Sequence, residues 1–126
     1  MNALRRRVVL QIALLAAAAV AGPSRAAPPP AEQQRIESLI RFVEGQPGIR
    51  FVRNGSPYSP AQAGKFLRGK LDSMGGDVQT ARQFIDRIAT QSSTSGKPYT
   101  VQLPDGRSVP SAQFLGDELA RLERGS

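Results

Sequence analysis

The segment YTVQLPDGRSV, residues 99–109, carries most of the information about the fold of this chain. Its first five residues alternate between apolar and polar side chains, which is the pattern of a strand with one buried face. Asp105-Gly106 is a strong signal for a tight turn, and residues 107–109 form a short returning arm that stops at Pro110. The segment therefore predicts a β-hairpin.

A further strand is predicted at residues 49–53, where Ile49 and Phe51 would share one face. The turn dipeptide Asn54-Gly55 closes it. Because one short strand cannot satisfy its own hydrogen-bond ladder, we expect it to pair with the hairpin. The result would be a small, mostly antiparallel sheet of two or three strands.

Helical patterns surround these strands. Residues 32–44 repeat apolar side chains at the i, i+3, i+4, i+7 spacing and stop before Gly45. Ser59-Pro60 offers an N-cap followed by a proline at the first helical position, so a second helix should begin there. It should end at about Met74, before two glycines.

Two more helices follow. Thr80 and Gln83 suggest a capping box for a third helix that reaches about Ala89. Ser111 is expected to cap the last helix. The inward-facing residues of that helix would be Phe114, Leu115, Leu119 and Leu122. We therefore predict a single α+β domain over residues 32–124, with about four helices packed on the sheet.

The amino end has the pattern of an export signal. Three arginines at residues 5–7 precede a mainly apolar run at 8–21, and Ser-Arg-Ala at 24–26 fits a small-x-small cleavage site. We expect residues 1–26 to be a cleavable signal peptide and residues 27–31 to be a proline-rich spacer. The protein would be periplasmic or secreted. The alternative, an uncleaved membrane anchor, needs about 20 apolar residues, more than this run offers.

The charge of the chain has to be judged without that signal. Four of the 17 basic residues and none of the 10 acidic residues lie in the first 26 positions. The remainder holds 13 basic and 10 acidic residues, a formal net charge of +3, which is ordinary for a small soluble domain. The basic character of the whole chain is therefore weak support for nucleic-acid binding.

The composition excludes several kinds of active site. The chain has no histidine and no cysteine. Ser-His-Asp and Cys-His nucleophiles, thiol redox chemistry and the usual zinc, copper and haem ligand sets are therefore absent. We expect no cofactor and no metal. The ten scattered acidic residues leave a carboxylate-based hydrolase as an alternative.

Lys70 departs from the pattern of its helix, because it falls within the apolar arc. That arc is formed by Ala63, Phe66, Leu67, Leu71 and Met74. One interpretation is a lysine that buries its stem and extends its ammonium to the edge. The other is a cation at the floor of a groove, paired with a carboxylate or waiting for an anionic ligand. Asp86 is the preferred partner, and the carbonyl groups of residues 92–96 are the second choice.

Residues 92–98, SSTSGKP, form the second unusual feature. Their hydroxyl groups could cap neighbouring helices, or they could form an accessible rim for a polar or anionic partner. The candidate binding residues of the chain are accordingly Arg53, Asn54, Lys70, Ser93, Ser95, Gly96 and Lys97.

Four blocks of the sequence resemble the YfeK-like family of small exported bacterial proteins. They are residues 51–55 (FVRNG), 67–71 (LRGKL), 80–86 (TARQFID) and 92–99 (SSTSGKPY). The resemblance extends over about residues 36–122 and implies a periplasmic-type, single-domain protein. That family has no assigned activity, so the resemblance supplies no catalytic residues.

These observations favour a non-catalytic binding or interaction module of the cell envelope, whose partner would be an envelope protein or a polar ligand. The alternative is a histidine-free hydrolase that acts on an envelope polymer through carboxylates or a Ser/Lys pair. Two carboxylates about 5–10 Å apart in a concave site, or Lys70 within reach of a loop serine, would favour the hydrolase. A flat or convex apolar patch beside the serine-rich loop would favour the module. Nucleic-acid binding ranks last, because it needs exposed aromatic residues among clustered cations.

Overall fold

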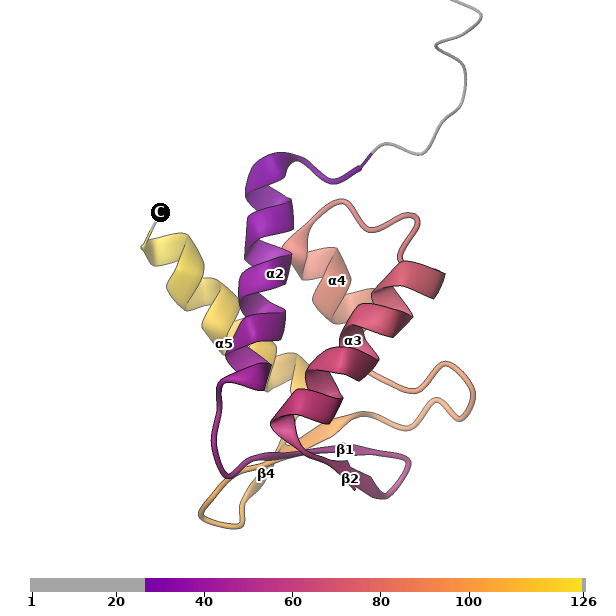
Figure 1. The fold of residues 1–126 in the computed structure, drawn as a ribbon, viewed down its shortest axis with the longest axis vertical. Helices are drawn as coiled ribbons and strands as arrows, with labels where there is room; N and C mark the ends of the chain where they lie inside the picture. Colours follow the sequence, from indigo (N-terminus) through magenta and orange to yellow (C-terminus); the bar gives the residue numbers. More distant parts are fainter. Residues whose placement is uncertain (1–26, 126) are drawn as a thin grey trace, which may run out of the picture.

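Four helices and four strands follow one another in residues 27–125, the part of the chain that this computed structural model describes. Their order is α2 (Pro30–Glu44), β1 (Arg50–Arg53), β2 (Ser56–Tyr58), α3 (Pro60–Met74), α4 (Ala81–Arg87), β3 (Thr100–Gln102), β4 (Ser108–Pro110) and α5 (Ser111–Arg124) (Figure 1). The predicted α+β fold is confirmed. The expected signal peptide lies outside the described residues. Across residues 27–125, no helix is both long and apolar enough to cross a bilayer.

The strands form one antiparallel sheet in the order β2-β1-β3-β4. Phe51 lies at its centre, opposite Tyr58 on β2 and Val101 on β3. The predicted pairing of the strand at 49–53 with the 99–109 hairpin is therefore confirmed. The described sheet has four strands rather than the two or three predicted.

The additional strand is β2, which Pro57 obscures in the sequence. Asn54 and Gly55 both have positive φ angles, 50° and 80°, as a two-residue type I′ hairpin turn requires. The chain therefore turns back at this point and continues the sheet. Pro57 lies opposite Val52 on an edge strand, where a missing N–H breaks no ladder hydrogen bond. Pro110 ends the other edge strand, β4.

The four helices lie on one side of the sheet, and the core lies between them and the sheet (Figure 1). Phe51 and Val101 point into this core from the two central strands and are almost completely buried. Leu39, Leu67, Phe84 and Leu115 bring one buried side chain each from the four helices. Burial of a side chain of this size contributes about 1.5–3 kcal/mol. Since the chain has no cysteine, packing holds the domain together without disulfides.

Two helix starts follow the sequence signals closely. At α3, Ser59 and Gln62 form a reciprocal capping box, with bonds of 3.2 and 2.9 Å. At α4, the Thr80 hydroxyl accepts the backbone N–H of Gln83, as predicted. The Gln83 side chain instead accepts the N–H of Gln79, so this second capping box is only half formed.

The predicted cap of the last helix is wrong. Ser111 is the first residue of α5, and its N-cap is Pro110. The reason is that β4 runs directly into the helix, so that the Ser111 N–H donates to the carbonyl of Tyr99 on the neighbouring segment at 2.9 Å. The Ser111 hydroxyl is buried and has no hydrogen-bond partner.

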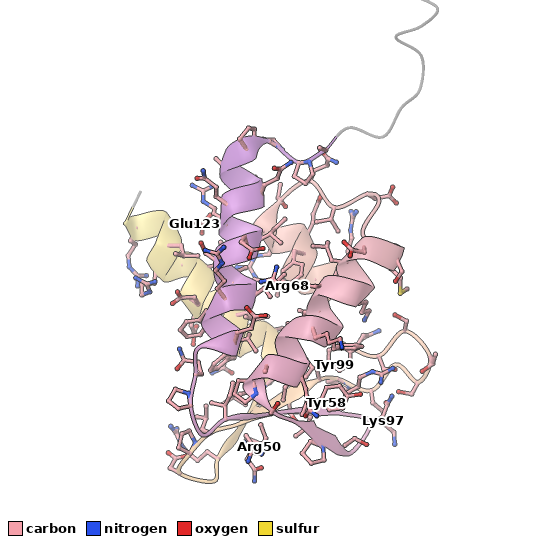
Figure 2. All side chains as sticks on the ribbon, viewed as in Figure 1. Arg50, Tyr58, Arg68, Lys97, Tyr99 and Glu123 are labelled. Atoms are coloured by element: carbon pink, nitrogen blue, oxygen red, sulfur yellow. The ribbon has the colours of Figure 1, made fainter. Side chains whose placement is uncertain are left out.

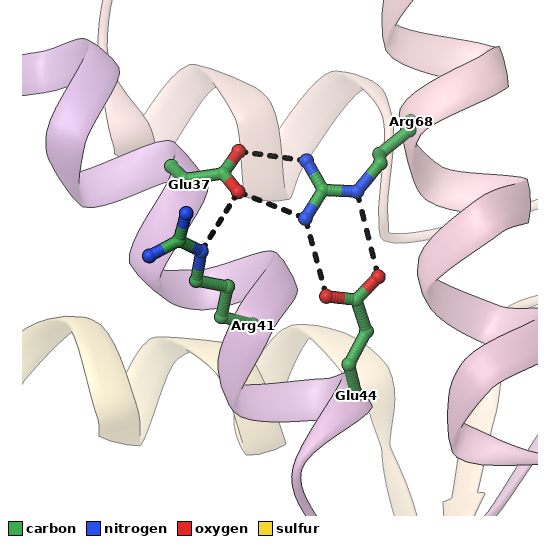
Figure 3. A network of polar contacts seen from close by, with 4 residues as sticks. All are labelled: Glu37, Arg41, Glu44 and Arg68. Atoms are coloured by element: carbon green, nitrogen blue, oxygen red, sulfur yellow. Dashed lines mark hydrogen bonds and ion pairs between the residues drawn. The ribbon is translucent and has the colours of Figure 1, made fainter.

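A cluster of ionic bonds joins α2 to α3 (Figure 3). Arg68 on α3 donates to both oxygens of Glu37 at 2.7 and 2.9 Å and to both oxygens of Glu44 at 3.1 and 3.4 Å. Arg41 adds a 3.0 Å bond to Glu37. One turn before Arg68, Gly64 lies directly under the Glu44 side chain, which would be 2.2–2.5 Å from a Cβ at that position. The two helices therefore approach closely, with a fully paired arginine over the contact.

Candidate groove on helix α3

A groove with a volume of about 400 Å³ runs along the face of α3 toward the serine-rich loop. One stripe of the helix forms its floor, because positions 66, 69, 70 and 73 follow the i, i+3, i+4, i+7 spacing of a single face. The full lining is Arg53, Lys65, Phe66, Gly69, Lys70, Ser73, Met74, Ser92, Ser93, Thr94 and Tyr99. Met74, on its rim, is the exposed large hydrophobic residue of the described part of the chain.

Lys70 is buried at the floor of the groove, with 7% of the residue exposed. Its Nζ donates to the Tyr99 hydroxyl and to the Gln91 carbonyl, both at 2.9 Å. Tyr99 is itself 1% exposed and directly precedes β3 (Figure 2). Among residues 27–125, no carboxylate forms an ion pair with Lys70. Its ammonium group is therefore held by two neutral oxygen atoms and by a cation–π contact with the Tyr99 ring, whose centre is 4.8 Å from Nζ.

The predicted burial of Lys70 is confirmed, but the predicted partner is wrong. Asp86 is an exposed residue of α4 and makes no bond to the lysine. The side chain instead extends toward the segment that leads into β3, whose position depends on the sheet. The second choice, a loop carbonyl, was closer: the acceptor is Gln91, one residue before the predicted range 92–96.

Arg53 is a second basic residue that lines the groove. Its guanidinium carbon is 4.7 Å from the centre of the Phe66 ring, and its Nη1 donates to the Tyr58 hydroxyl at 2.9 Å. That hydrogen bond raises the pKa of Arg53, with a smaller contribution from Tyr99. The Nε atom of Arg53 is buried without a hydrogen-bond partner. A second cation is thus fixed at the groove, again without a carboxylate partner in the described part of the chain.

The serine-rich loop is organised by Ser92, a buried residue that the candidate set did not include. Its hydroxyl oxygen accepts the backbone N–H groups of Thr94 and Ser95 and the amide of Asn54, each at 3.3 Å. Ser95 donates in turn to the Asn54 side-chain oxygen at 2.6 Å. The β1–β2 turn and the loop are therefore fastened together, which fixes one end of the groove.

The seven candidate binding residues fall into three groups. Three of them line the groove: Arg53, Lys70 and Ser93. Asn54 and Ser95 make the fastening and lie outside the lining. Gly96, with a φ of 74°, and Lys97 are exposed residues of the loop and do not belong to the groove lining.

Sequence reasoning missed the groove residues that come from apolar or small positions. Tyr99 was assigned to the strand pattern, and Phe66 to the apolar arc. Gly69, a glycine inside a predicted helix on the same stripe as Lys70, was the available signal.

The charged side chains that line the groove are all basic. Lys65, Lys70 and Arg53 are cationic, three serines and a threonine supply hydroxyl groups, and no lining residue is Asp or Glu. The described residues contain no cluster of three His, Cys, Asp or Glu side chains that could hold a metal ion. The arrangement suits an anionic group that enters beside apolar surface.

The chain belongs to the DUF5329 family, a family of unknown function whose model matches residues 30–123. It is also 38% identical over 68 residues to the uncharacterized protein YfeK of Salmonella typhimurium (strain LT2). That match covers 54% of this chain and 57% of the Salmonella protein. No solved structure has significant similarity to the chain. The resemblance seen in the sequence is thus confirmed at the level of the family.

Proposed function

We propose that this protein is an exported, non-catalytic binding module of the cell envelope, and that the groove on α3 holds an anionic ligand. The observation that carries the proposal is the surroundings of Lys70. An ammonium group has three N–H donors, and two of them are used by Gln91 and Tyr99. The third has no hydrogen-bond acceptor among residues 27–125; the Tyr99 ring centre is 4.8 Å from Nζ, and the side chain lines the groove from which an anion would approach.

The energetics of burial support the same conclusion. A charge that is removed from water costs several kcal/mol unless an opposite charge and further hydrogen bonds compensate it. Lys70 has the hydrogen bonds but lacks the opposite charge. Arg53 adds a further positive charge to the groove lining. An anionic ligand would supply the missing counter-charge, and removal of its own water would strengthen the attraction.

The groove lining gives less support to the alternative function, a histidine-free hydrolase. Its lining holds no pair of carboxylates, so neither an acid nor a base of the glycosidase type is present. Lys70 is hydrogen-bonded to Tyr99 and Gln91 rather than to a serine. The Ser92 hydroxyl oxygen already accepts hydrogen bonds from the backbone N–H groups of Thr94 and Ser95 in its own loop. The site is concave, however, which differs from the flat patch expected of an interaction module.

The test compares binding of small anions by the wild type and by two variants, each purified after expression of the full-length chain. Inorganic phosphate, sulfate and hexanoate are titrated while backbone amide shifts are followed by NMR, with butylammonium as the cationic control. At least one anion should shift the amides of Gly69, Lys70 and Ser93, and Lys70→Met should abolish the shifts. Arg124→Met, at the end of α5, should leave them unchanged. Absence of anion-dependent shifts, or equal shifts in Lys70→Met, would contradict the proposal.

Export is the second part of the proposal and rests on residues 1–26. A reporter enzyme that is active only outside the cytoplasm, fused after the last residue, should be active with the full-length chain. Replacement of the three arginines at 5–7 by glutamates should reduce that activity. Amino-terminal sequencing of the recovered protein should begin at Ala27. A protein that retains Met1 or stays in the cytoplasm would contradict export.

A further inference from the structure

Helix α3 contains two interior glycines whose surroundings differ completely. A Cβ on Gly64 would lie 2.2 Å from an oxygen of Glu44, so the close approach of α2 requires a glycine there. A Cβ on Gly69 would have no atom within 4 Å. Packing therefore explains the first glycine and leaves the second unexplained.

A glycine inside a helix is unfavourable, because alanine stabilises the same position by about 1 kcal/mol. Gly69 is also an ordinary helical residue without a positive φ. It lines the groove beside Lys70, between Phe66 and Met74. The bare backbone at this position leaves the middle of the groove floor open.

We infer that Gly69 keeps the floor clear for an organic carboxylate. Its apolar body would lie across Gly69 against Phe66 and Met74, and its carboxylate would reach the ammonium group of Lys70. This inference rests on the proposed function and specifies its ligand. The choice of a carboxylate follows from charge: Lys70 is the buried cation of the lining, no lining residue is acidic, and the single negative charge of a carboxylate matches one ammonium group.

The apolar part of the ligand follows from the remaining surface. Phe66 and Met74 are the large apolar side chains that α3 contributes to the groove; Phe66 is partly buried, and Met74 is 55% exposed. An inorganic anion would leave these side chains in water. An acid with an alkyl or aromatic body would cover them and gain about 25 cal/mol for each Å² of apolar surface removed from water.

Three variants test the role of Gly69, with hexanoate as the probe. Gly69→Ala should raise the thermal midpoint by several degrees and weaken hexanoate binding about tenfold, because one methyl group would enter the space of the ligand. Gly69→Leu should abolish binding. Gly116→Ala is the matched control: Gly116 is an interior glycine of α5 at which a Cβ fits, its nearest neighbour being Arg82 at 3.6 Å. It should stabilise the protein without changing binding. Wild-type affinity in Gly69→Ala and Gly69→Leu would overturn the inference.

Three further probes test the ligand class. Hexanamide, which is neutral, should bind at least about tenfold more weakly than hexanoate. If phosphate shifts the groove amides in a Lys70-dependent manner and hexanoate does not, the carboxylate inference fails while the proposed function stands. If no anion shifts them, both fail. A tripeptide acetyl-Ala-Ala-Leu with a free carboxyl end, compared with its amide, shows whether the carboxylate belongs to a peptide end. Preference for the free acid supports the inference. If neither this peptide nor hexanoate binds, the inference is contradicted.

Discussion

Arg68 and Lys70 are two residues apart on α3, yet only one of these two cations is paired with carboxylates. Arg68 faces α2 and is bonded to two carboxylates, Glu37 and Glu44, through four hydrogen bonds (Figure 3). These bonds raise its pKa, with Glu37 as the main cause. Lys70 is far more buried and has no carboxylate partner within residues 27–125. The better-buried cation is the less compensated one.

This difference separates a cation that serves the fold from one that is available to a ligand. The Arg68 side of α3 is closed: the helices touch at Gly64, and every nitrogen of the guanidinium has a partner. The Lys70 side is open, with a groove in place of a neighbouring helix. Substitutions on the closed side should therefore change stability, and those on the open side should change binding.

The largest effect on stability is expected from Arg68→Met. The variant leaves two acidic residues of α2 facing each other without their cation, so the free energy of unfolding should fall by about 1–2 kcal/mol. Chemical denaturation at neutral pH measures it. Arg41→Met is the control, because Arg41 is mostly exposed and makes one bond to Glu37. Its effect should stay within about 0.5 kcal/mol. Equal effects of both variants would contradict a structural role specific to Arg68.

A smaller loss is expected from Gly64→Ala. The added methyl group displaces the Glu44 side chain and its bonds to Arg68, a cost of about 1–3 kcal/mol that the better helix propensity of alanine partly offsets. A net destabilisation of about 1 kcal/mol follows. Gly116→Ala, measured in the same way, should be stabilising. If both variants stabilise the protein, the contact between α2 and α3 is looser than the distances indicate.

Acid should weaken the closed side of the helix. The hydrogen bond from Arg68 lowers the pKa of Glu37 below its ordinary value of 4.5, and the Ala81 N–H does the same for Glu32. A depressed carboxyl pKa contributes stability above the unfolded pKa and loses it as the pH falls through the folded one. Stability should therefore decrease below about pH 5. Because Arg68 is the main cause for Glu37, Arg68→Met should show a shallower decrease. Identical slopes would contradict the assignment.

The fold was largely predictable because its signals are local. The alternation at 99–103, the Asp-Gly turn and the Ser59 cap each act within a few residues, and each appears where the sequence indicates. The incorrect predictions concern residues whose local structure is determined by a segment distant in the sequence. Ser111 loses its capping role because its N–H bonds to Tyr99. The strand β2 was missed because Pro57 is acceptable only at a sheet edge, and the order of strands is not a local property.

The candidate groove was predictable only in part, for the same reason. Helical periodicity alone places Lys70 on the buried arc. Its partners Gln91 and Tyr99 come from a segment about 20–30 residues later in the chain. The position of that segment is set by the packing of the sheet under α3. Asn54 and Ser95 were selected from the sequence, but their mutual bond emerges only when the β1–β2 turn meets the loop. Periodicity identifies a face, and tertiary contacts determine what meets it.

The smallest expected effect is the coupling between Lys70 and Asp86, which sharpens the comparison between the two cations. Lys70→Met leaves the Gln91 carbonyl and the Tyr99 hydroxyl without this donor, a cost of about 1–3 kcal/mol. Removal of a desolvated charge largely offsets that cost, so the net change in stability should stay below about 1 kcal/mol. Asp86→Asn changes an exposed residue and should have little effect. Because the two residues make no bond, the double variant should equal the sum of the single variants within about 0.3–0.5 kcal/mol.

A double-mutant cycle by chemical denaturation measures this coupling, with hexanoate binding followed on the same four proteins. The expected result is additive stability, with binding lost in both proteins that lack Lys70 and retained in Asp86→Asn. Arg68→Met with Glu37→Gln is the positive control, since those residues share two hydrogen bonds and should couple. Coupling above about 1 kcal/mol between Lys70 and Asp86 would mean that the lysine has a structural carboxylate partner in solution. The contrast with Arg68 would then disappear, because both cations of α3 would be compensated by the protein itself.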